Sequence, residues 1–242
     1  MSVKFWQERT DLAAALRLAA YFNLHEGVDN HFSTAVPDTD DWFLMNPYGL
    51  HWSEVRARDL LLLDAKGNVI EGEGEAETSA ISIHAPVHRA HRRARCVLHT
   101  HMPYATALTS IEDGQLEPVS QNALRYHNDV AYDRQYNGLA NEQAEGERLA
   151  AAMGDKRVLF MENHGVLVVG ESIAAAFDDL YFLERACQVQ VLAMSTGRPL
   201  KRVTGNMAAT FGAWPGMNGP YAQTHFTAMK RLLDRDNPGY AD

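Results

Sequence analysis

The strongest constraint on the fold comes from residues 157–170, which read RVLFMENHGVLVVG. Two apolar runs rich in Val and Leu flank a short Asn-His-Gly segment, a pattern that predicts two strands joined by a tight turn. Residues 31–47 and 59–74 show the same arrangement of short apolar runs around turn-forming residues. Strands joined by such short turns pair antiparallel. We therefore expect a mainly antiparallel sheet.

Helical patterns alternate with these strands, and a further strand is predicted at residues 95–101. In the helix predicted from Thr78, either Thr78 or Ser79 is the expected N-cap, and Pro86 bends the helix or delays its start. Gly27 is the expected C-cap of the first helix. The alternation predicts an α/β chain with helices packed on the sheet. The predicted helices cover residues 8–27, 78–94, 142–154 and 172–197, with another beginning at Pro103.

The chain has 242 residues, which is enough to bury a sizeable core. We interpret residues 1–242 as a single domain. Residues 204–242 form a C-terminal extension that begins with a stretch rich in Gly and aromatic residues. This stretch covers a neighbouring subunit, covers an active site, or forms a loosely packed tail, and the sequence does not choose among these.

Charge and composition exclude several classes of protein. The formal net charge of -9 argues against a general nucleic-acid binder, because phosphate backbones require a basic face. No apolar run approaches the length of a membrane span, and the N-terminal segment predicts an amphipathic helix and not a signal peptide. The two cysteines lie in apolar surroundings without CxxC spacing. They predict buried thiols in a cytoplasmic protein.

Two histidines, His99 and His101, end the strand predicted at residues 95–101. Residues two apart on a strand face the same side, so both imidazoles can reach one metal ion. His164 in the predicted turn supplies a possible third imidazole, and Gly165 beside it indicates positive φ or a close backbone approach. Three neutral imidazoles with an open position can form a catalytic site for Zn²⁺ or another divalent metal. The alternative is ordinary packed or turn histidines that bond to the backbone.

Four segments together resemble the class II aldolase/adducin family: HTHMPYATALT, NHGVLVVG, MNPYGL and DNHFSTAVP. That family includes sugar-phosphate aldolases, ribulose-phosphate 4-epimerases, decarboxylases, dehydratases and adducin. The resemblance implies a three-layer α/β/α sandwich with a mainly antiparallel central sheet, assembled as a homotetramer with active sites at subunit interfaces. It also implies that Zn²⁺, or else Mn²⁺ or Fe²⁺, is bound by three histidines, and that five further residues bind substrate. The implied ligands are His99, His101 and His164, and the implied substrate-binding residues are Asn30, Asn46, Gly49, Thr78 and Ser79.

The sequence departs from the aldolases at one position that matters for chemistry. Their motif is Ser-Ser-Glu, in which the Glu is the acid/base, and Ala80 stands in its place here. A methyl group cannot transfer a proton, so ordinary sugar-phosphate cleavage is not the default expectation. Thr78 and Ser79 still offer hydroxyls and helix-start N–H groups, while Tyr48 would narrow the pocket. The pattern is closer to the adducin-like branch of the family.

Three residues are candidates for the missing proton carrier: Glu77, Tyr126 and His127. Glu77 lies three residues before Ala80, and its alternative role is to complement the helix dipole. By the resemblance, Tyr126 and His127 lie in the region that serves a neighbouring subunit's site. The reference pKa of histidine, about 6.5, suits His127 to neutral pH, although it is equally well interpreted as a surface histidine.

Other residues have weaker predicted roles. Glu184, on an otherwise apolar helix face, is predicted to orient a ligand histidine. His84 and His88 share a helix face at i and i+4, so a metal bound by this pair is a further possibility.

The sequence therefore predicts a divalent-metal-dependent carbon–carbon lyase, an aldolase or decarboxylase, acting on a small oxygenated or carboxylate substrate. In such an enzyme the ion would act as a Lewis acid. Two alternatives stay open: a metal-dependent oxygenase on the same scaffold, and a non-catalytic adducin-like binding module.

Overall fold

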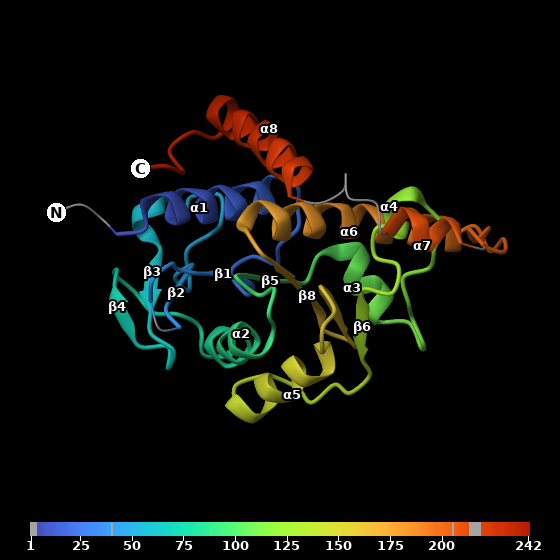
Figure 1. Cartoon of the computed structure of the whole chain (residues 1–242), viewed down its shortest axis with the longest axis horizontal. Coiled ribbons are helices and arrows are strands. Elements are labelled where there is room, and N and C mark those ends of the chain that lie inside the picture. The colour runs from blue at the N-terminus through green and yellow to red at the C-terminus, as the bar shows by residue number, and fades with distance from the viewer. Residues whose placement is uncertain (1–3, 40, 205, 213–218) are drawn as a thin grey trace.

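A single eight-stranded sheet organises the molecule (Figure 1). The computed structural model describes residues 4–39, 41–204, 206–212 and 219–242. The strand order is β4-β3-β2-β1-β5-β8-β7-β6, and every neighbouring pair is antiparallel except β6 and β7. The strands are β1 (His31–Ala35), β2 (Phe43–Met45), β3 (Leu61–Leu63), β4 (Val69–Glu71), β5 (Cys96–Thr100), β6 (Val130–Asp133), β7 (Val158–Met161) and β8 (Gly165–Gly170).

Helices cover both faces of the sheet, which gives the predicted three-layer α/β/α sandwich (Figure 1). One face packs against α1, α3 and α6, with α8 outside α1 and α6, and the other packs against α2 and α5. The helices are α1 (Trp6–Tyr21), α2 (Thr78–Ala90), α3 (Pro103–Thr109), α4 (Gln121–Leu124), α5 (Gln143–Met153), α6 (Ile173–Met194), α7 (Met207–Gly212) and α8 (Pro220–Asp236), with a 3-10 turn at Ala57–Asp59.

The register of the central strands decides which side chains meet. His31 on β1 lies directly opposite His99 on β5, and Thr100 lies opposite Val166 on β8. Side chains alternate along each strand, so Leu98 packs into the core beneath α1 and α6 while Val97 packs beneath α2 and α5. By the same alternation the histidines at 31 and 99 face the α2 side of the sheet.

The structure corrects three predicted helix boundaries, one of which is the end of α2, at Ala90 and not at residue 94. The first helix ends at Tyr21 and not at Gly27, which instead has a φ of 55° in the loop that follows. The N-cap of α2 is Glu77 and not Thr78 or Ser79, because Glu77 is the last residue with extended backbone angles. Pro86 does not delay the start of α2, which continues past it to Ala90.

Helix α8 was not predicted, although its sequence is strongly amphipathic. Its buried residues Ala222, Phe226 and Leu233 face α1 and α6. The described part of residues 204–242 therefore packs on its own chain, while residue 205 and residues 213–218 lie outside the described residues. Whether this C-terminal extension also lies at a subunit interface, one of the three alternatives left open by the sequence, is not tested by a single chain.

The cysteines and the hydropathy of the helices agree with the sequence analysis. Cys96 and Cys187 are free and buried, and burial raises the pKa of both thiols. No helix among the described residues is long and apolar enough to cross a membrane.

Candidate metal and substrate site

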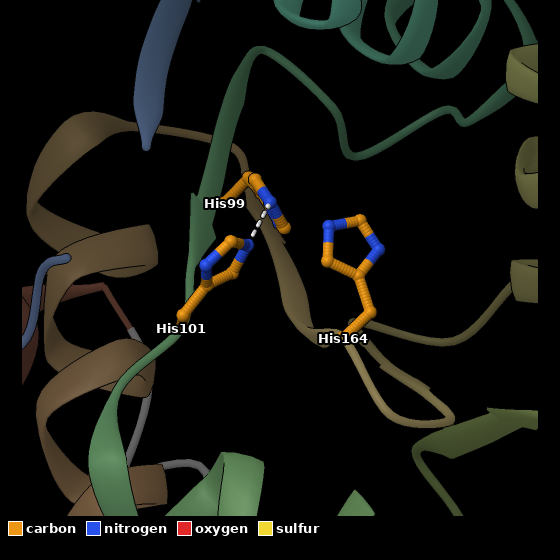
Figure 2. Close-up of side chains that lie close together, drawn as sticks. All are labelled: His99, His101 and His164. Atoms are coloured by element: carbon orange, nitrogen blue, oxygen red, sulfur yellow. Dashed lines mark hydrogen bonds between the residues drawn. The ribbon is translucent and has the colours of Figure 1, made fainter. Parts of the chain in front are cut away.

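Three histidine rings converge at one end of the central strands (Figure 2). His99 lies on β5, His101 follows its end, and His164 lies in the turn between β7 and β8. One ring nitrogen from each can be chosen so that all three lie within 4.8 Å of one another. No other group of this kind occurs among the described residues. The sequence-predicted triad is therefore brought together by the fold.

The hydrogen bonds of His99 determine which of its nitrogens is free. Its Nδ1–H donates to the carbonyl oxygen of Val166 at 3.0 Å, which leaves the Nε2 lone pair facing the other two rings. Nε2 of His101 lies 3.1 Å from it, so one of these nitrogens must carry a proton unless a cation lies between them. Three converging imidazole nitrogens suit a divalent transition metal.

Burial keeps the three imidazoles neutral, as ligands must be. It lowers the pKa of His99 well below its ordinary value and lowers that of His164 to about 4, with neighbouring histidines adding to both effects. Burial also lowers the pKa of His101, although Glu26 and Asp29 oppose it.

Gly165 is required for a close backbone approach and not for positive φ. A Cβ built on Gly165 would lie 2.5 Å from the carbonyl oxygen of Thr100 and 2.8 Å from Cδ2 of His101. The positive φ of this turn, 53°, belongs to Asn163. Of the two explanations that the sequence left open, the structure therefore selects the close approach.

Asn30 and Asn46, predicted to bind substrate, are both buried and bonded to the backbone. Oδ1 of Asn30 accepts from the N–H of Glu26 at 2.7 Å and from that of His101 at 3.2 Å. Oδ1 of Asn46 accepts from the N–H of Phe32 at 2.9 Å. Within the chain these two amides position strands and the segment that carries His101, and a role in substrate binding stays a prediction.

A small, shallow cleft lies next to the triad and includes Ala80, the position at which the aldolase motif has its Glu. Its lining includes Ala80, Asn30, Asn46, Tyr48 and His31, together with Val28 and Glu77. Because the N–H of His101 bonds to Asn30 and the ring of His31 lies 4.8 Å from that of His99, centroid to centroid, the cleft opens beside the triad.

Glu77 is the carboxylate of this cleft. Its Oε1 accepts from the hydroxyl of Ser79 at 2.7 Å, and its buried Oε2 has no hydrogen-bond partner. Thr78, the first residue of α2, is exposed, and Gly49 turns the loop with a φ of 81°. Of the predicted proton carriers, Glu77 is the one that lines the cleft.

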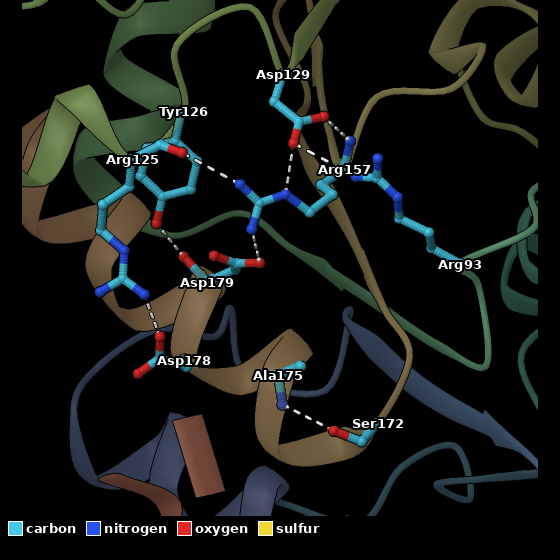
Figure 3. A network of polar contacts seen from close by, with 9 residues as sticks. All are labelled: Arg93, Arg125, Tyr126, Asp129, Arg157, Ser172, Ala175, Asp178 and Asp179. Atoms are coloured by element: carbon cyan, nitrogen blue, oxygen red, sulfur yellow. Dashed lines mark hydrogen bonds and ion pairs between the residues drawn. The ribbon is translucent and has the colours of Figure 1, made fainter. Parts of the chain in front are cut away.

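The other two candidates, Tyr126 and His127, do not line this cleft, and Figure 3 shows the polar network around Tyr126. Tyr126 is buried and donates its hydroxyl to the carbonyl oxygen of Asp179 at 2.6 Å, and burial raises its pKa well above the ordinary value. Around it, Arg157 pairs with Asp129 at 2.6 Å and with the Asp179 carboxylate at 2.8 Å. His127 is exposed. Within one chain neither residue contacts the triad.

Glu184 does not orient a ligand histidine, so that prediction is wrong. Its two carboxylate oxygens accept from the backbone N–H groups of Tyr104 and Ala105 at 2.8 and 2.9 Å, at the start of α3. Burial raises its pKa, while these two hydrogen bonds act in the opposite direction. A carboxylate here satisfies helix N–H groups that have no partner within the helix.

His31 and Ser33 are two further polar residues near the site that the motifs did not indicate, and they hydrogen-bond to His84 and His88. A usable signal was present, since strand alternation in HFSTA places residues 31 and 33 on one face. His84 and His88 therefore bond to these strand residues, and neither belongs to a group of three or more potential metal ligands among the described residues.

Comparison with known proteins agrees with this geometry. A family model described as the Class II Aldolase and Adducin N-terminal domain matches residues 10–191. The chain belongs to this family. A putative aldolase class 2 protein of Pseudomonas aeruginosa is 37% identical over 99% of this chain and 94% of its own length. The crystal structure of an aldolase II superfamily protein from Pseudomonas syringae superposes with a TM-score of 0.93 at 36% identity, covering 100% of this chain and 98% of the other.

The family also contains the adducins. Mouse alpha-adducin is 30% identical over 96% of this chain, which corresponds to 33% of the length of alpha-adducin. An L-fuculose 1-phosphate aldolase from Glaciozyma antarctica is 24% identical with a TM-score of 0.84, covering 98% of this chain and 96% of the other, and so shares the fold. The same scaffold thus occurs in proteins named as aldolases and in adducins.

Proposed function

We propose that the protein is a divalent-metal-dependent carbon–carbon lyase, an aldolase or decarboxylase, that acts on a small oxygenated or carboxylate substrate. The observation that carries this proposal is the convergence of three neutral imidazoles, from His99, His101 and His164, beside a cleft. Zn²⁺ is the first choice for this all-nitrogen donor set, with Mn²⁺ or Fe²⁺ as alternatives.

A cation held by the three nitrogens would supply Lewis-acid stabilisation of the negative charge that develops on substrate oxygen when a carbon–carbon bond breaks. The protein's part is to hold the ligands in place. His99 is oriented by its bond to Val166, and His101 by the bond from its backbone to Asn30. Because such supporting contacts fix ring orientation and tautomer, the ligands need little reorganisation.

Proton transfer is the step for which this chain differs from the aldolases. Ala80 has no proton to give, and we assign that role to Glu77, whose unpartnered Oε2 belongs to the same cleft. Decarboxylation suits this arrangement, because the leaving group carries no proton and only the carbanion must be protonated. The exposed His127 would serve the site of a neighbouring copy in a homotetramer. The hydroxyl of Tyr126 already donates to the carbonyl oxygen of Asp179, which favours a structural role for Tyr126.

Elemental analysis of the purified protein tests the metal site directly. The wild type should contain about one divalent ion per chain, and His99→Ala should contain none. His91→Ala is the matched control, because His91 is also buried but bonds to the carbonyl oxygen of Lys156 outside the site. Equal metal content in the wild type and in His99→Ala would refute the site.

Assays of the metal-loaded protein then separate the candidate functions. Carbon–carbon cleavage that proceeds without oxygen supports a lyase, and strict dependence on oxygen would support the oxygenase. A purified protein without stoichiometric metal would favour the adducin-like binding module. The similarity to alpha-adducin is the observation that supports this alternative. In Ala80→Glu, sugar-phosphate cleavage should appear if only the acid/base is missing.

A further inference from the structure

A continuous chain of hydrogen bonds runs behind the candidate site, between β1 and α2. Nδ1 of His31 lies 2.8 Å from Nε2 of His84, and Nδ1 of His84 lies 2.6 Å from Oγ of Ser33. The same hydroxyl oxygen lies 2.7 Å from Nε2 of His88, whose Nδ1 lies 2.6 Å from the carbonyl oxygen of Ala94. Three imidazoles and one hydroxyl are thus linked in series.

The carbonyl end determines the direction of every bond in this chain. A carbonyl can only accept, so Nδ1 of His88 carries the proton and its Nε2 is bare. Ser33 must therefore donate to His88 and accept from Nδ1–H of His84. Nε2 of His84 is then bare as well, and it accepts from Nδ1–H of His31.

This direction holds while the histidines are neutral. Burial lowers the pKa of His84 well below its ordinary value and that of His88 to about 4. Both imidazoles are therefore neutral near pH 7, and each has one donor and one acceptor nitrogen. The chain has a single consistent pattern of tautomers.

The open end of the chain lies at the candidate site. Nε2 of His31 has no hydrogen bond to another described residue, and His31 lines the cleft beside Ala80. Its ring is tilted by 33° against that of His99 with 4.8 Å between centroids. The residue with the bare Nε2 thus shares the lining of this cleft with Ala80, the position at which the aldolase motif has its Glu.

We propose that His31 is a substrate-binding residue whose Nε2 accepts a hydrogen bond from a hydroxyl group of the substrate, and that His84, Ser33 and His88 are positioning residues that hold it in the accepting tautomer. The identity of the bound molecule rests on the proposed function, whereas the tautomer does not. Such a site would favour substrates that carry a hydroxyl donor next to the metal-chelating oxygens. It would disfavour analogues in which that hydroxyl group is converted to an ether.

The tautomers can be measured in the metal-free protein by long-range ¹H–¹⁵N NMR of the histidine side chains at pH 7.5. His31, His84 and His88 should each show a protonated Nδ1 and a bare Nε2. Ser33→Ala breaks the chain, and His88→Phe removes its carbonyl-bound end while keeping a ring against Phe43. In both variants His31 should show a mixture of tautomers, and a protonated Nε2 of His31 in the wild type would overturn the inference.

Thr34→Ala is the matched control for these variants. Thr34 is the next residue on the same strand, is also buried, and bonds to the carbonyl oxygen of Arg95. Its replacement should leave the tautomer of His31 unchanged. If either chain-breaking variant fails to fold, the wild-type spectrum still decides the tautomer.

Binding of two chelators to the Zn²⁺-loaded protein tests the consequence for recognition. Glycolohydroxamate and methoxyacetohydroxamate chelate through the same two oxygens, but only the former carries a hydroxyl donor. One net hydrogen bond predicts that the wild type prefers glycolohydroxamate by roughly fivefold in calorimetry. In Ser33→Ala the ratio of the two affinities, glycolohydroxamate over methoxyacetohydroxamate, should fall by about half or more. The extra methyl group of methoxyacetohydroxamate is present in the measurements on both proteins, so its bulk does not explain a change in this ratio.

The outcomes separate the two proposals. An unchanged ratio in Ser33→Ala and His88→Phe would overturn the role of the chain although the metal site stands. Failure of the wild type to bind Zn²⁺ or either chelator would instead refute the proposed function, and the NMR tautomers would still report on the chain.

Discussion

Asn30→Ala should weaken metal binding without removing a ligand. The Asn30 side chain is 2% exposed, and its Oδ1 accepts from two backbone N–H groups, those of Glu26 and His101. Alanine leaves both donors without that partner. An unsatisfied donor costs about 1–3 kcal/mol when it is buried, and these two hydrogen bonds are only part-buried. We therefore take about 1–2 kcal/mol for each and expect the free energy of unfolding to fall by about 2–4 kcal/mol. For a chain of this size that corresponds to a drop in Tm of roughly 4–16 °C.

The effect on the metal follows from the second of these bonds. His101 lies beyond the end of β5, and the bond to Asn30 ties its backbone to the loop before β1. Loss of a contact that positions a ligand typically weakens metal binding by about 10- to 100-fold. Competition with a chromophoric chelator measures Kd for Zn²⁺, and differential scanning calorimetry measures Tm.

Asn46→Ala is the matched control for this prediction. Asn46 is also buried and accepts from one backbone N–H, that of Phe32, but it touches no ligand backbone. It should lower Tm and leave Kd for Zn²⁺ within about twofold of the wild type, since less than 0.5 kcal/mol separates such values. Equal losses of metal affinity in the two variants, or no loss in Asn30→Ala, would refute the positioning role.

Three further outcomes are expected. Gly165→Ala places a methyl group against the segment that carries His101, so metal content and Tm should both fall, with overpacking costing about 1–3 kcal/mol; full metal content at the wild-type Tm would contradict this. Because the pKa of His88 is about 4 in the folded protein and about 6.5 in the unfolded chain, the unfolded chain binds more protons between these values. The free energy of unfolding should therefore decrease as the pH is lowered through this window, by up to about 1.4 kcal/mol per pH unit from this residue. Urea titrations of the wild type and of His88→Phe at pH 8, 6 and 5 should show a smaller decrease in the variant. Arg157→Met removes the cation that pairs with the Asp179 carboxylate and should lower the free energy of unfolding in urea by about 3–5 kcal/mol, with the metal content unchanged. A loss of metal in this variant would instead show that the network supports the triad.

The predictable part of the fold follows from local patterns. The sequence predicts the antiparallel pairs and the long helix after Ser172 because apolar periodicity and turn residues agree there, and Ser172 does cap α6 by accepting from the N–H of Ala175 at 3.1 Å. β6 escapes prediction because its residues are only partly apolar and its partner β7 is parallel and distant in the chain. α8 was also not predicted, because the Gly-rich stretch before it makes the start of its amphipathic pattern hard to recognise in the sequence.

The site divides in the same way. His99 and His101 are predictable because strand alternation at i and i+2 is local. His164 is predictable as a third imidazole from the Asn-His-Gly turn, and the family resemblance supports the same three ligands. The role of Glu184 is wrong in the sequence analysis because an acid on an apolar face reports only burial, and the three-dimensional packing of α6 on α3 supplies the partners. Asn30 is assigned to substrate by the family resemblance, and that role stays a prediction. Its bonds to the backbone N–H groups of Glu26 and His101 depend on the fold and cannot be read from the sequence.

His31 shows how sheet register creates a site that no single segment encodes. It lies opposite His99 because β1 and β5 pair antiparallel, and it meets His84 because α2 crosses the same face. Ala80, on that helix, is small enough to leave a cleft that His31 and Glu77 both line. Under the proposed function, the substrate would meet His31 and Glu77 at this cleft in place of the carboxylate of the aldolase motif. The expected consequence is a changed substrate preference, because hydroxyl recognition by His31 depends on residues far from the metal ligands in sequence.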